Sequence, residues 1–211
     1  MRWYGCSTKF DPTFPQNHAD LGWALTNQWH ADSNTGSPPV GWYADVKNGY
    51  WSLVIHQQSS PGVYLKTFSI IDVPLPVGTC HDVKMQIKWS KSDTAGSIKL
   101  WPNGVQQTFV NGSTTYNIRT LIPGSTTVYY KEGMYRQATT PTDIVYHTGF
   151  RTATDEGGLY GRWSAAATEP EEIAEGKARG IGRAAESAAV GHQDVMLHSY
   201  VVASWQAGRN C

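Results

Sequence analysis

The chain has 211 residues, a length that suits one domain with a sizeable core, and it carries 17 acidic and 17 basic side chains. This balance does not favour a nucleic-acid partner, because polyanions attract basic surfaces. No apolar run approaches the roughly 18 residues that a membrane-spanning helix needs, and the first residues do not resemble a signal peptide. Nine Trp, eleven Tyr, 21 Gly and 11 Pro indicate short aromatic strands joined by tight turns, a composition typical of all-β domains that stack sugar rings.

The three cysteines indicate no metal site. Cys6, Cys80 and Cys211 form neither a CxxC pair nor a His/Cys spacing typical of zinc ligands, so we expect no metal and no cofactor. Cys6 and Cys80 are candidates for a disulfide bond in an oxidising compartment, but the sequence alone does not establish that pairing.

The first motif in chain order is "NQWH", residues 27–30. In a strand, alternate side chains point to opposite faces, so Gln28 and His30 share one face and Trp29 points to the other. A single histidine in a β-protein is more often a surface or structural residue than a functional one. The motif therefore needs a second group of residues before it indicates a site.

Residues 36–127 contain repeated strand and turn signals and no amphipathic helix. In "ADVKNGYWSLVIH", Asn48-Gly49 predicts a hairpin in which both turn residues have positive φ. A second turn is predicted at Pro102-Asn103-Gly104. The alternation in "VKMQIKW" predicts a half-buried strand with four core-facing side chains, Val83, Met85, Ile87 and Trp89. These signals together predict a β-sandwich or jelly roll.

The segment "YYKEGMYRQ", residues 129–137, is the second motif. As a strand it exposes one polar and aromatic face, made of Tyr129, Lys131, Gly133, Tyr135 and Gln137. Its opposite face, made of Val128, Tyr130 and Met134, is expected to point to the core. A solvated surface is the simpler interpretation of such a segment. However, two strands that each present polar groups at a period of two can line one groove, and this links the segment to Gln28 and His30.

The aromatic strand pattern ends after residue 163. Residues 164–191 are rich in alanine and lack aromatic side chains, and their glycines each weaken a helix by roughly 1 kcal/mol relative to alanine. We therefore predict a β-domain over residues 1–163 and a tail over residues 164–211. The tail is expected to be irregular or partly helical, and poorly packed or mobile.

Together the two motifs, Gln28-Trp29-His30 and Tyr-x-Lys-x-Gly-x-Tyr-x-Gln over 129–137, resemble those of the β-jelly-roll polysaccharide lyases. This group includes alginate lyases, glucuronan lyases and heparin lyase I-like enzymes. The segments "IKWSKSDTAGSIKLWPNG" and "GSTTYNI" resemble the glucuronan and heparin lyase-like branch, and the resemblance extends from about Arg2 to Glu156. It implies an all-β, two-sheet jelly-roll sandwich of the concanavalin A-like type, in an extracellular and monomeric protein.

The resemblance also implies a reaction, the β-elimination of a uronic-acid polysaccharide such as glucuronan, alginate or a heparin-like polymer. Gln28 would stabilise the charge that develops on the sugar carboxylate. His30 and Tyr135 would be base and acid, or Tyr135 would perform both transfers where the C5 hydrogen and O4 lie on the same side of the sugar. Lys131 would attract the polyanion, and two further residues would contact the sugar, namely Tyr129 and Gln137.

One feature of the alginate lyases in this group has no counterpart in the chain. They carry an arginine-rich strand before the Gln-x-His motif, whereas Arg2 is the only arginine before Gln28. We therefore expect that N-terminal strands with a carboxylate-neutralising arginine are missing from this sequence. Two alternatives to an active lyase stay open, a non-catalytic carbohydrate-binding jelly roll and an inactive truncated remnant of a lyase.

Overall fold

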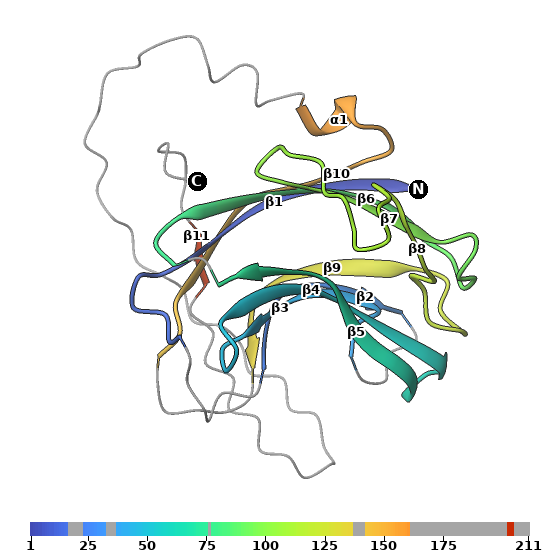
Figure 1. Cartoon of the computed structure of the whole chain (residues 1–211), viewed down its shortest axis with the longest axis horizontal. Coiled ribbons are helices and arrows are strands. Elements are labelled where there is room, and N and C mark those ends of the chain that lie inside the picture. Colours follow the sequence, from blue (N-terminus) through green and yellow to red (C-terminus); the bar gives the residue numbers. More distant parts are fainter. Residues whose placement is uncertain (17–22, 33–36, 76, 137–141, 161–201, 205–211) are drawn as a thin grey trace.

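The computed structural model describes residues 1–16, 23–32, 37–75, 77–136, 142–160 and 202–204. These residues form two mainly antiparallel sheets that pack face to face (Figure 1). One sheet has six strands in the order β11-β10-β1-β6-β7-β8, and the other has five in the order β5-β4-β3-β2-β9. The predicted all-β sandwich is therefore confirmed.

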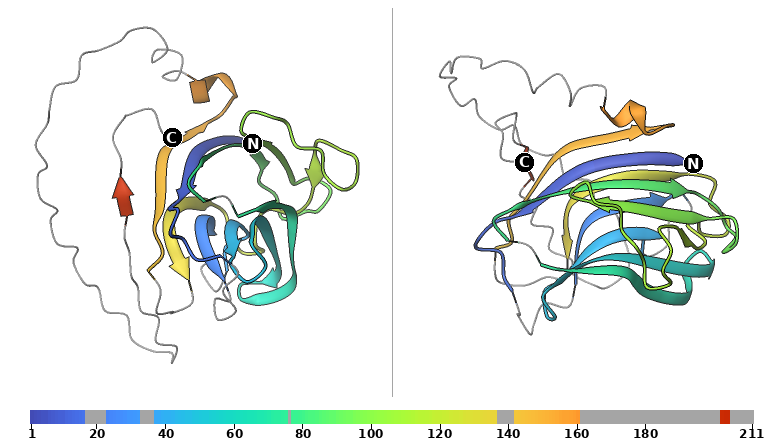
Figure 2. Two further views of the ribbon diagram at one scale, coloured as in Figure 1. Left: turned by 60° about the vertical axis from the view of Figure 1, so that its left-hand side comes forward. Right: turned by 45° about the horizontal axis from the view of Figure 1, so that its top comes forward.

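The strand bounds follow the aromatic and β-branched runs of the sequence. The six-stranded sheet contains β1 (Arg2–Phe10), β6 (Cys80–Lys88), β7 (Ser97–Pro102), β8 (Tyr116–Asn117), β10 (Val145–Ala153) and β11 (Val202–Ser204). The five-stranded sheet contains β2 (Ala24–Ala31), β3 (Val40–Asp45), β4 (Tyr50–Ser60), β5 (Val63–Pro74) and β9 (Val128–Arg136). A short helix, α1 (Gly157–Tyr160), lies beside the six-stranded sheet, on its side away from the five-stranded one (Figure 2).

The core between the sheets is built from large aromatic and aliphatic side chains. Trp29, Trp42 and Trp51 of the five-stranded sheet are almost fully buried, and the rings of Trp42 and Trp51 stack with centroids 4.3 Å apart. From the six-stranded sheet, Met85 and Ile87 are completely buried, as the alternation in their strand predicts. Burying such a side chain contributes about 1.5–3 kcal/mol. Each sheet therefore buries one face in the core, and the other face of the five-stranded sheet lies outside the core.

The two predicted turns are present, and one differs in detail. Gly49 has a φ of +74° and its N–H donates to the Asp45 carbonyl at 2.8 Å, but Asn48 does not have a positive φ. The prediction for Asn48 is wrong because the turn spans four residues, 46–49, and the Asn48 side-chain amide instead donates to the Asp45 carboxylate at 2.8 Å. In the second turn, Asn103 and Gly104 have φ values of 48° and 81°.

Cys6 and Cys80 are not paired with each other. Cys6 is a free, buried thiol whose pKa is raised to about 12 by burial, while Cys80 takes part in a disulfide bond. In the register of β1 with β6, Cys80 lies opposite Lys9, and Cys6 lies opposite Val83. Three strand positions separate the two cysteines, or about 10 Å, which is too far for a disulfide.

Some predictions fall on residues outside the described part of the chain. Gln137 and the predicted boundary at residue 163 are among them. Of the predicted tail, the structure describes residues 202–204, which form β11 and pair in parallel with β10.

Candidate active site

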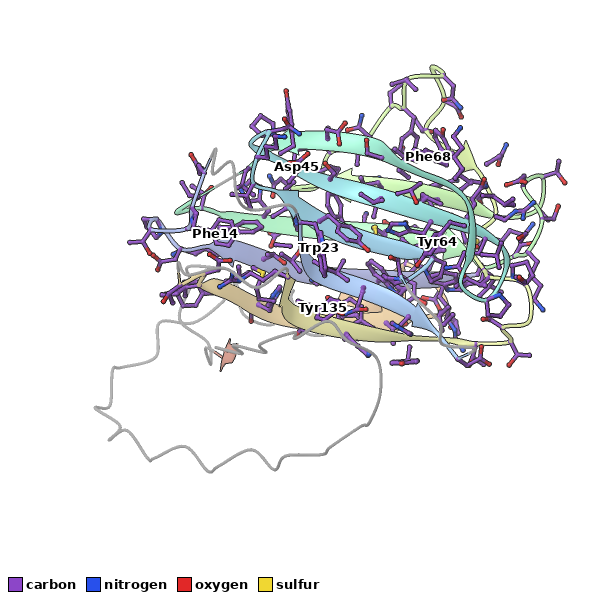
Figure 3. All side chains as sticks on the ribbon, turned by 90° about the horizontal axis from the view of Figure 1, so that it is seen from below. Phe14, Trp23, Asp45, Tyr64, Phe68 and Tyr135 are labelled. Carbon is purple, nitrogen blue, oxygen red and sulfur yellow. The ribbon has the colours of Figure 1, made fainter. Side chains whose placement is uncertain are left out.

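The outer face of the five-stranded sheet is concave and holds a groove of about 1100 Å³ (Figure 3). Side chains from all five strands line it, because every strand of this sheet turns alternate residues away from the core. In the view onto this face, Trp23 and Tyr135 lie toward β9, while Asp45 and Phe68 lie toward the opposite side. The groove therefore has a β2–β9 side and a β3–β5 side.

On the β2–β9 side, β2 contributes Gln28 and His30 to the groove and Trp29 to the core, as the alternation predicts. His30 is 7% exposed, and its Nδ1 lies 3.0 Å from the Ala31 carbonyl oxygen. A carbonyl can only accept, so Nδ1 carries the hydrogen and donates it, which leaves Nε2 with a lone pair in the neutral ring. Burial lowers the pKa of His30, and the charge of Lys131 lowers it further, against the Ala31 hydrogen bond, which raises it.

β9 pairs with β2 and brings the second motif to the same side. Lys131 lies opposite Gln28, and Tyr129 lies opposite His30. Lys131 and Tyr135 line the groove, and Met134, a core residue, also reaches it. Two strands that are far apart in the sequence thus bring together the amide of Gln28, the imidazole of His30 and the ammonium of Lys131. The phenol of Tyr135 lines the same groove farther along the strand pair, opposite Leu25.

A register shift between β2 and β9 adds groove residues that alternation does not predict. The shift lies between Leu25 and Asn27 of β2, where β9 advances by one residue more than β2 does. Leu25 consequently lines the groove together with Gln28, although an odd number of positions separates them. Gly133, on β9 at this point, has a φ of +138°, which L side chains rarely adopt.

Aromatic contacts hold the predicted tyrosines in place. The ring of Tyr135 packs against Trp23 with centroids 5.2 Å apart. Tyr129 is 45% exposed, and its ring centroid lies 5.3 Å from that of His30. The Lys131 ammonium nitrogen lies 5.1 Å from the Tyr129 ring centroid, within the range of a cation–π contact. Tyr129 therefore joins His30 and Lys131 at the groove margin.

In the described part of the chain, Lys131 is the only lysine or arginine that lines the groove. Arg119 forms an ion pair with Asp93 at 3.0 Å, and Arg151 belongs to β10 of the other sheet, where it donates to the Leu159 carbonyl. Arg2 begins β1, also in the other sheet. Arg136 ends β9 and forms an ion pair with Asp143 at 2.7 Å, and it does not line the groove. No described arginine therefore takes the place of the one that alginate lyases carry before the Gln-x-His motif.

The β3–β5 side contains residues that the motif analysis did not identify. Tyr43 on β3 and His56 on β4 both line the groove, with the Tyr43 hydroxyl 3.0 Å from His56 Nε2. His56 Nδ1 lies 2.9 Å from the hydroxyl of Thr67 on β5. Two carboxylates, Asp45 and Asp72, line the same side. The period of two in β4 could have predicted that four of its side chains share the groove face, namely Tyr50, Ser52, Val54 and His56.

Neither a metal centre nor a membrane helix is found in the residues that the structure describes. No three of their His, Cys, Asp and Glu side chains gather closely enough to hold a metal ion. Among the same residues, no helix has both the length and the apolar character needed to cross a bilayer.

Comparison with known proteins places this architecture. A model of the family described as polysaccharide lyase matches residues 1–151. The chain belongs to the polysaccharide lyase family. The chain matches none of the curated proteins with which it was compared.

A solved structure shares the fold of this chain, and two others are similar to it over a smaller part. An endo-β-1,4-glucuronan lyase from the fungus Trichoderma reesei superposes with a TM-score of 0.55 at 16% identity, over 75% of this chain and 70% of the fungal one. An alginate lyase from Pseudomonas aeruginosa superposes with a TM-score of 0.47 at 16% identity, over 72% of this chain and 64% of the Pseudomonas one. An alginate lyase from Klebsiella pneumoniae superposes with a TM-score of 0.44 at 13% identity, over 74% of this chain and 60% of the Klebsiella one. The chain spans less than two thirds of these two bacterial structures. The likeness to the glucuronan lyase confirms the fold as a β-jelly roll.

Proposed function

We propose that this polysaccharide lyase cleaves a uronic-acid-containing polysaccharide by β-elimination in the groove of the five-stranded sheet. The observation that carries the proposal is that Gln28, His30, Lys131 and Tyr135 all line this groove from two paired strands. These are the residue types that elimination next to a carboxylate requires.

The first requirement is to make the C5 hydrogen acidic. Negative charge develops on the sugar carboxylate as the proton leaves, and donors that meet this charge lower the barrier. Gln28 supplies an amide donor, and Lys131 lies opposite it across the strand pair. We assign to these two residues the neutralising role that an arginine has in alginate lyases of the group.

The second requirement is a base and an acid. The C5–H bond breaks and its proton passes to the base, the C4=C5 double bond forms, and the C4–O4 bond breaks as O4 takes a proton from the acid. His30 suits the base, because its Nδ1–H is held by the Ala31 carbonyl and its lowered pKa keeps Nε2 unprotonated at neutral pH. Tyr135 suits the acid, or serves as both groups when the C5 hydrogen and O4 lie on one side of the sugar.

The proposed substrate is an anionic polysaccharide, glucuronan, alginate or a heparin-like polymer, in an extracellular setting. Tyr129, whose ring packs against His30, is assigned to sugar contact, and Gln137 retains the same proposed role. A non-catalytic carbohydrate-binding jelly roll is the second candidate, favoured by the aromatic side chains that line the groove away from Tyr135, such as Tyr50 and Tyr64.

The test is to incubate the protein with glucuronan, alginate and heparin and to follow the ultraviolet absorbance of a C4=C5 unsaturated uronate. A Tyr135→Phe variant serves as the matched control, since it lacks only the proposed acid. A rise in absorbance that this variant does not show supports the proposal. Retardation of the same polymers in an affinity gel without any absorbance signal would instead establish the binding module.

A further inference from the structure

The ring of Tyr43 lies against Gly41 in the groove. A Cβ atom at Gly41 would come within 3.0 Å of Tyr43 Cε2 and 2.9 Å of Leu25 Cδ1. Both distances are shorter than ordinary van der Waals contact, so a side chain at this position would displace one of its neighbours. Gly41 thus provides the space that lets the Tyr43 ring lie along β3 and direct its hydroxyl toward β4.

That hydroxyl belongs to a chain of hydrogen bonds across three strands. The Tyr43 hydroxyl lies 3.0 Å from His56 Nε2, and His56 Nδ1 lies 2.9 Å from the Thr67 hydroxyl oxygen. A phenol is a stronger donor than an aliphatic hydroxyl, so the favoured arrangement has Tyr43 donating to Nε2 and the Nδ1–H donating to Thr67. The single hydrogen of the Tyr43 hydroxyl is then committed to His56.

The surroundings keep both partners neutral. Burial lowers the pKa of His56 to about 4, so its ring accepts from Tyr43 without carrying charge at neutral pH. Burial also raises the pKa of Tyr43, and the nearby phenols of Tyr64 and Tyr135 raise it further, against a hydrogen bond with the Ser37 side chain, which lowers it. The Tyr43 oxygen therefore keeps a lone pair for the groove. Tyr43 and Tyr135 flank Leu25 from the two strands that pair with β2.

We propose that Tyr43, held by His56 over Gly41, is a specificity-determining residue that accepts a hydrogen bond from an unesterified hydroxyl of the sugar bound beside Tyr135. A sulfated or acylated hydroxyl has no hydrogen to donate and cannot form this bond with the Tyr43 oxygen. Asp45 and Asp72 line the same side and are likewise acceptors, so they add repulsion against sulfate. This inference rests on the proposed function and narrows its substrate to polymers that lack esters on this sugar.

The test compares glucuronan with the same polymer after partial O-sulfation, using wild type, Tyr43→Phe and the control Tyr116→Phe. Tyr116 lies on β8 of the other sheet, so the control makes the same chemical change away from the groove. Wild type is expected to prefer the unmodified polymer by about a hundredfold in kcat/KM, since a site built to bind a hydroxyl rejects analogues that lack it. Tyr43→Phe is expected to lose about tenfold on unmodified polymer, mainly in KM, and nothing on the sulfated form.

His56 provides an independent test. His56→Leu removes the acceptor that holds the Tyr43 hydroxyl and is expected to reduce the preference, whereas His56→Gln keeps an amide oxygen that accepts from Tyr43 and should restore most of it. Melting curves identify any variant that fails to fold, and the other variants then carry the comparison.

Binding separates this inference from the proposed function. In the Tyr135→Phe background, affinity electrophoresis measures the preference for unmodified polymer without turnover. A preference that depends on Tyr43, with no elimination by wild type, supports the inference and overturns the proposed function. Equal binding and equal cleavage of both polymers, or an unchanged preference in Tyr43→Phe, overturns the inference and leaves the lyase function standing.

Discussion

The two sides of the groove each hold a histidine with a lowered pKa beside a tyrosine, yet the histidines are bound in different ways. On the β2–β9 side, the Nδ1–H of His30 donates to a main-chain carbonyl, which leaves a lone pair on Nε2. On the β3–β5 side, both ring nitrogens of His56 are engaged by side chains, those of Thr67 and Tyr43. The difference teaches that residue type does not identify a base, because the partners of each ring nitrogen decide whether a proton can be taken.

The largest expected effect separates the two sides most sharply. Tyr135→Phe keeps the ring packed on Trp23 but removes the hydroxyl, so elimination should fall by about a thousandfold or more, while polymer binding stays nearly unchanged. Tyr43→Phe should instead act mainly on KM. Steady-state kinetics and affinity electrophoresis on both variants measure this split. Turnover close to wild type in Tyr135→Phe would remove this residue from the mechanism.

Gln28→Leu tests the charge stabilisation on the β2–β9 side. Loss of one preorganised donor to developing charge typically costs a hundredfold to a thousandfold in kcat, and Leu keeps a similar volume in the strand. The measurement is kcat at saturating polymer, with melting temperature as the folding control. An effect confined to KM would show that Gln28 binds the ground state and not the developing charge.

Lys131→Ala should weaken polymer binding by about tenfold at low ionic strength and by less at physiological salt, because salt screens the attraction to the polyanion. The control is Lys99→Ala, since Lys99 lies on β7 of the other sheet, opposite Gln86. Dissociation constants over a salt series measure the effect. A loss that does not depend on salt would assign Lys131 to packing on Tyr129 instead of to attraction.

The smallest expected effect is a pH dependence of folding stability that comes from His56 on the β3–β5 side. The pKa of His56 is about 4 when folded and near 6.5 when unfolded, so between these values the unfolded chain binds more protons. The stabilisation is complete above pH 6.5 and is lost as the pH falls toward 4. His147, buried with a pKa also lowered to about 4, acts in the same direction.

The check is urea unfolding of wild type and His56→Gln from neutral pH down to pH 4. As the pH falls, the free energy of unfolding should decrease less in the variant than in wild type. The part of the decrease that comes from His147 should remain in both proteins. Identical pH profiles would show that His56 is not held neutral in the folded protein.

Much of the candidate site was predictable because strand alternation is local. The placement of Gln28 and His30 on one face, with Trp29 in the core, follows from the period of two within a single strand. The same holds for Lys131, Tyr135 and Met134 in β9. Their motif spacing also identified the lyase family, which the family match confirms.

What the tertiary structure decided depends on pairing between distant segments. Register along β1 and β6 separates Cys6 from Cys80, and the shift between β2 and β9 turns Leu25 into the groove. The Tyr43–His56–Thr67 chain exists because β3, β4 and β5 lie side by side and Gly41 leaves room for a ring. The sequence by itself determined which face each side chain takes within its strand, since steric alternation acts between neighbours along the chain. Only the sheet order and register decided which of those side chains meet, because these are set by non-local hydrogen bonding and core packing.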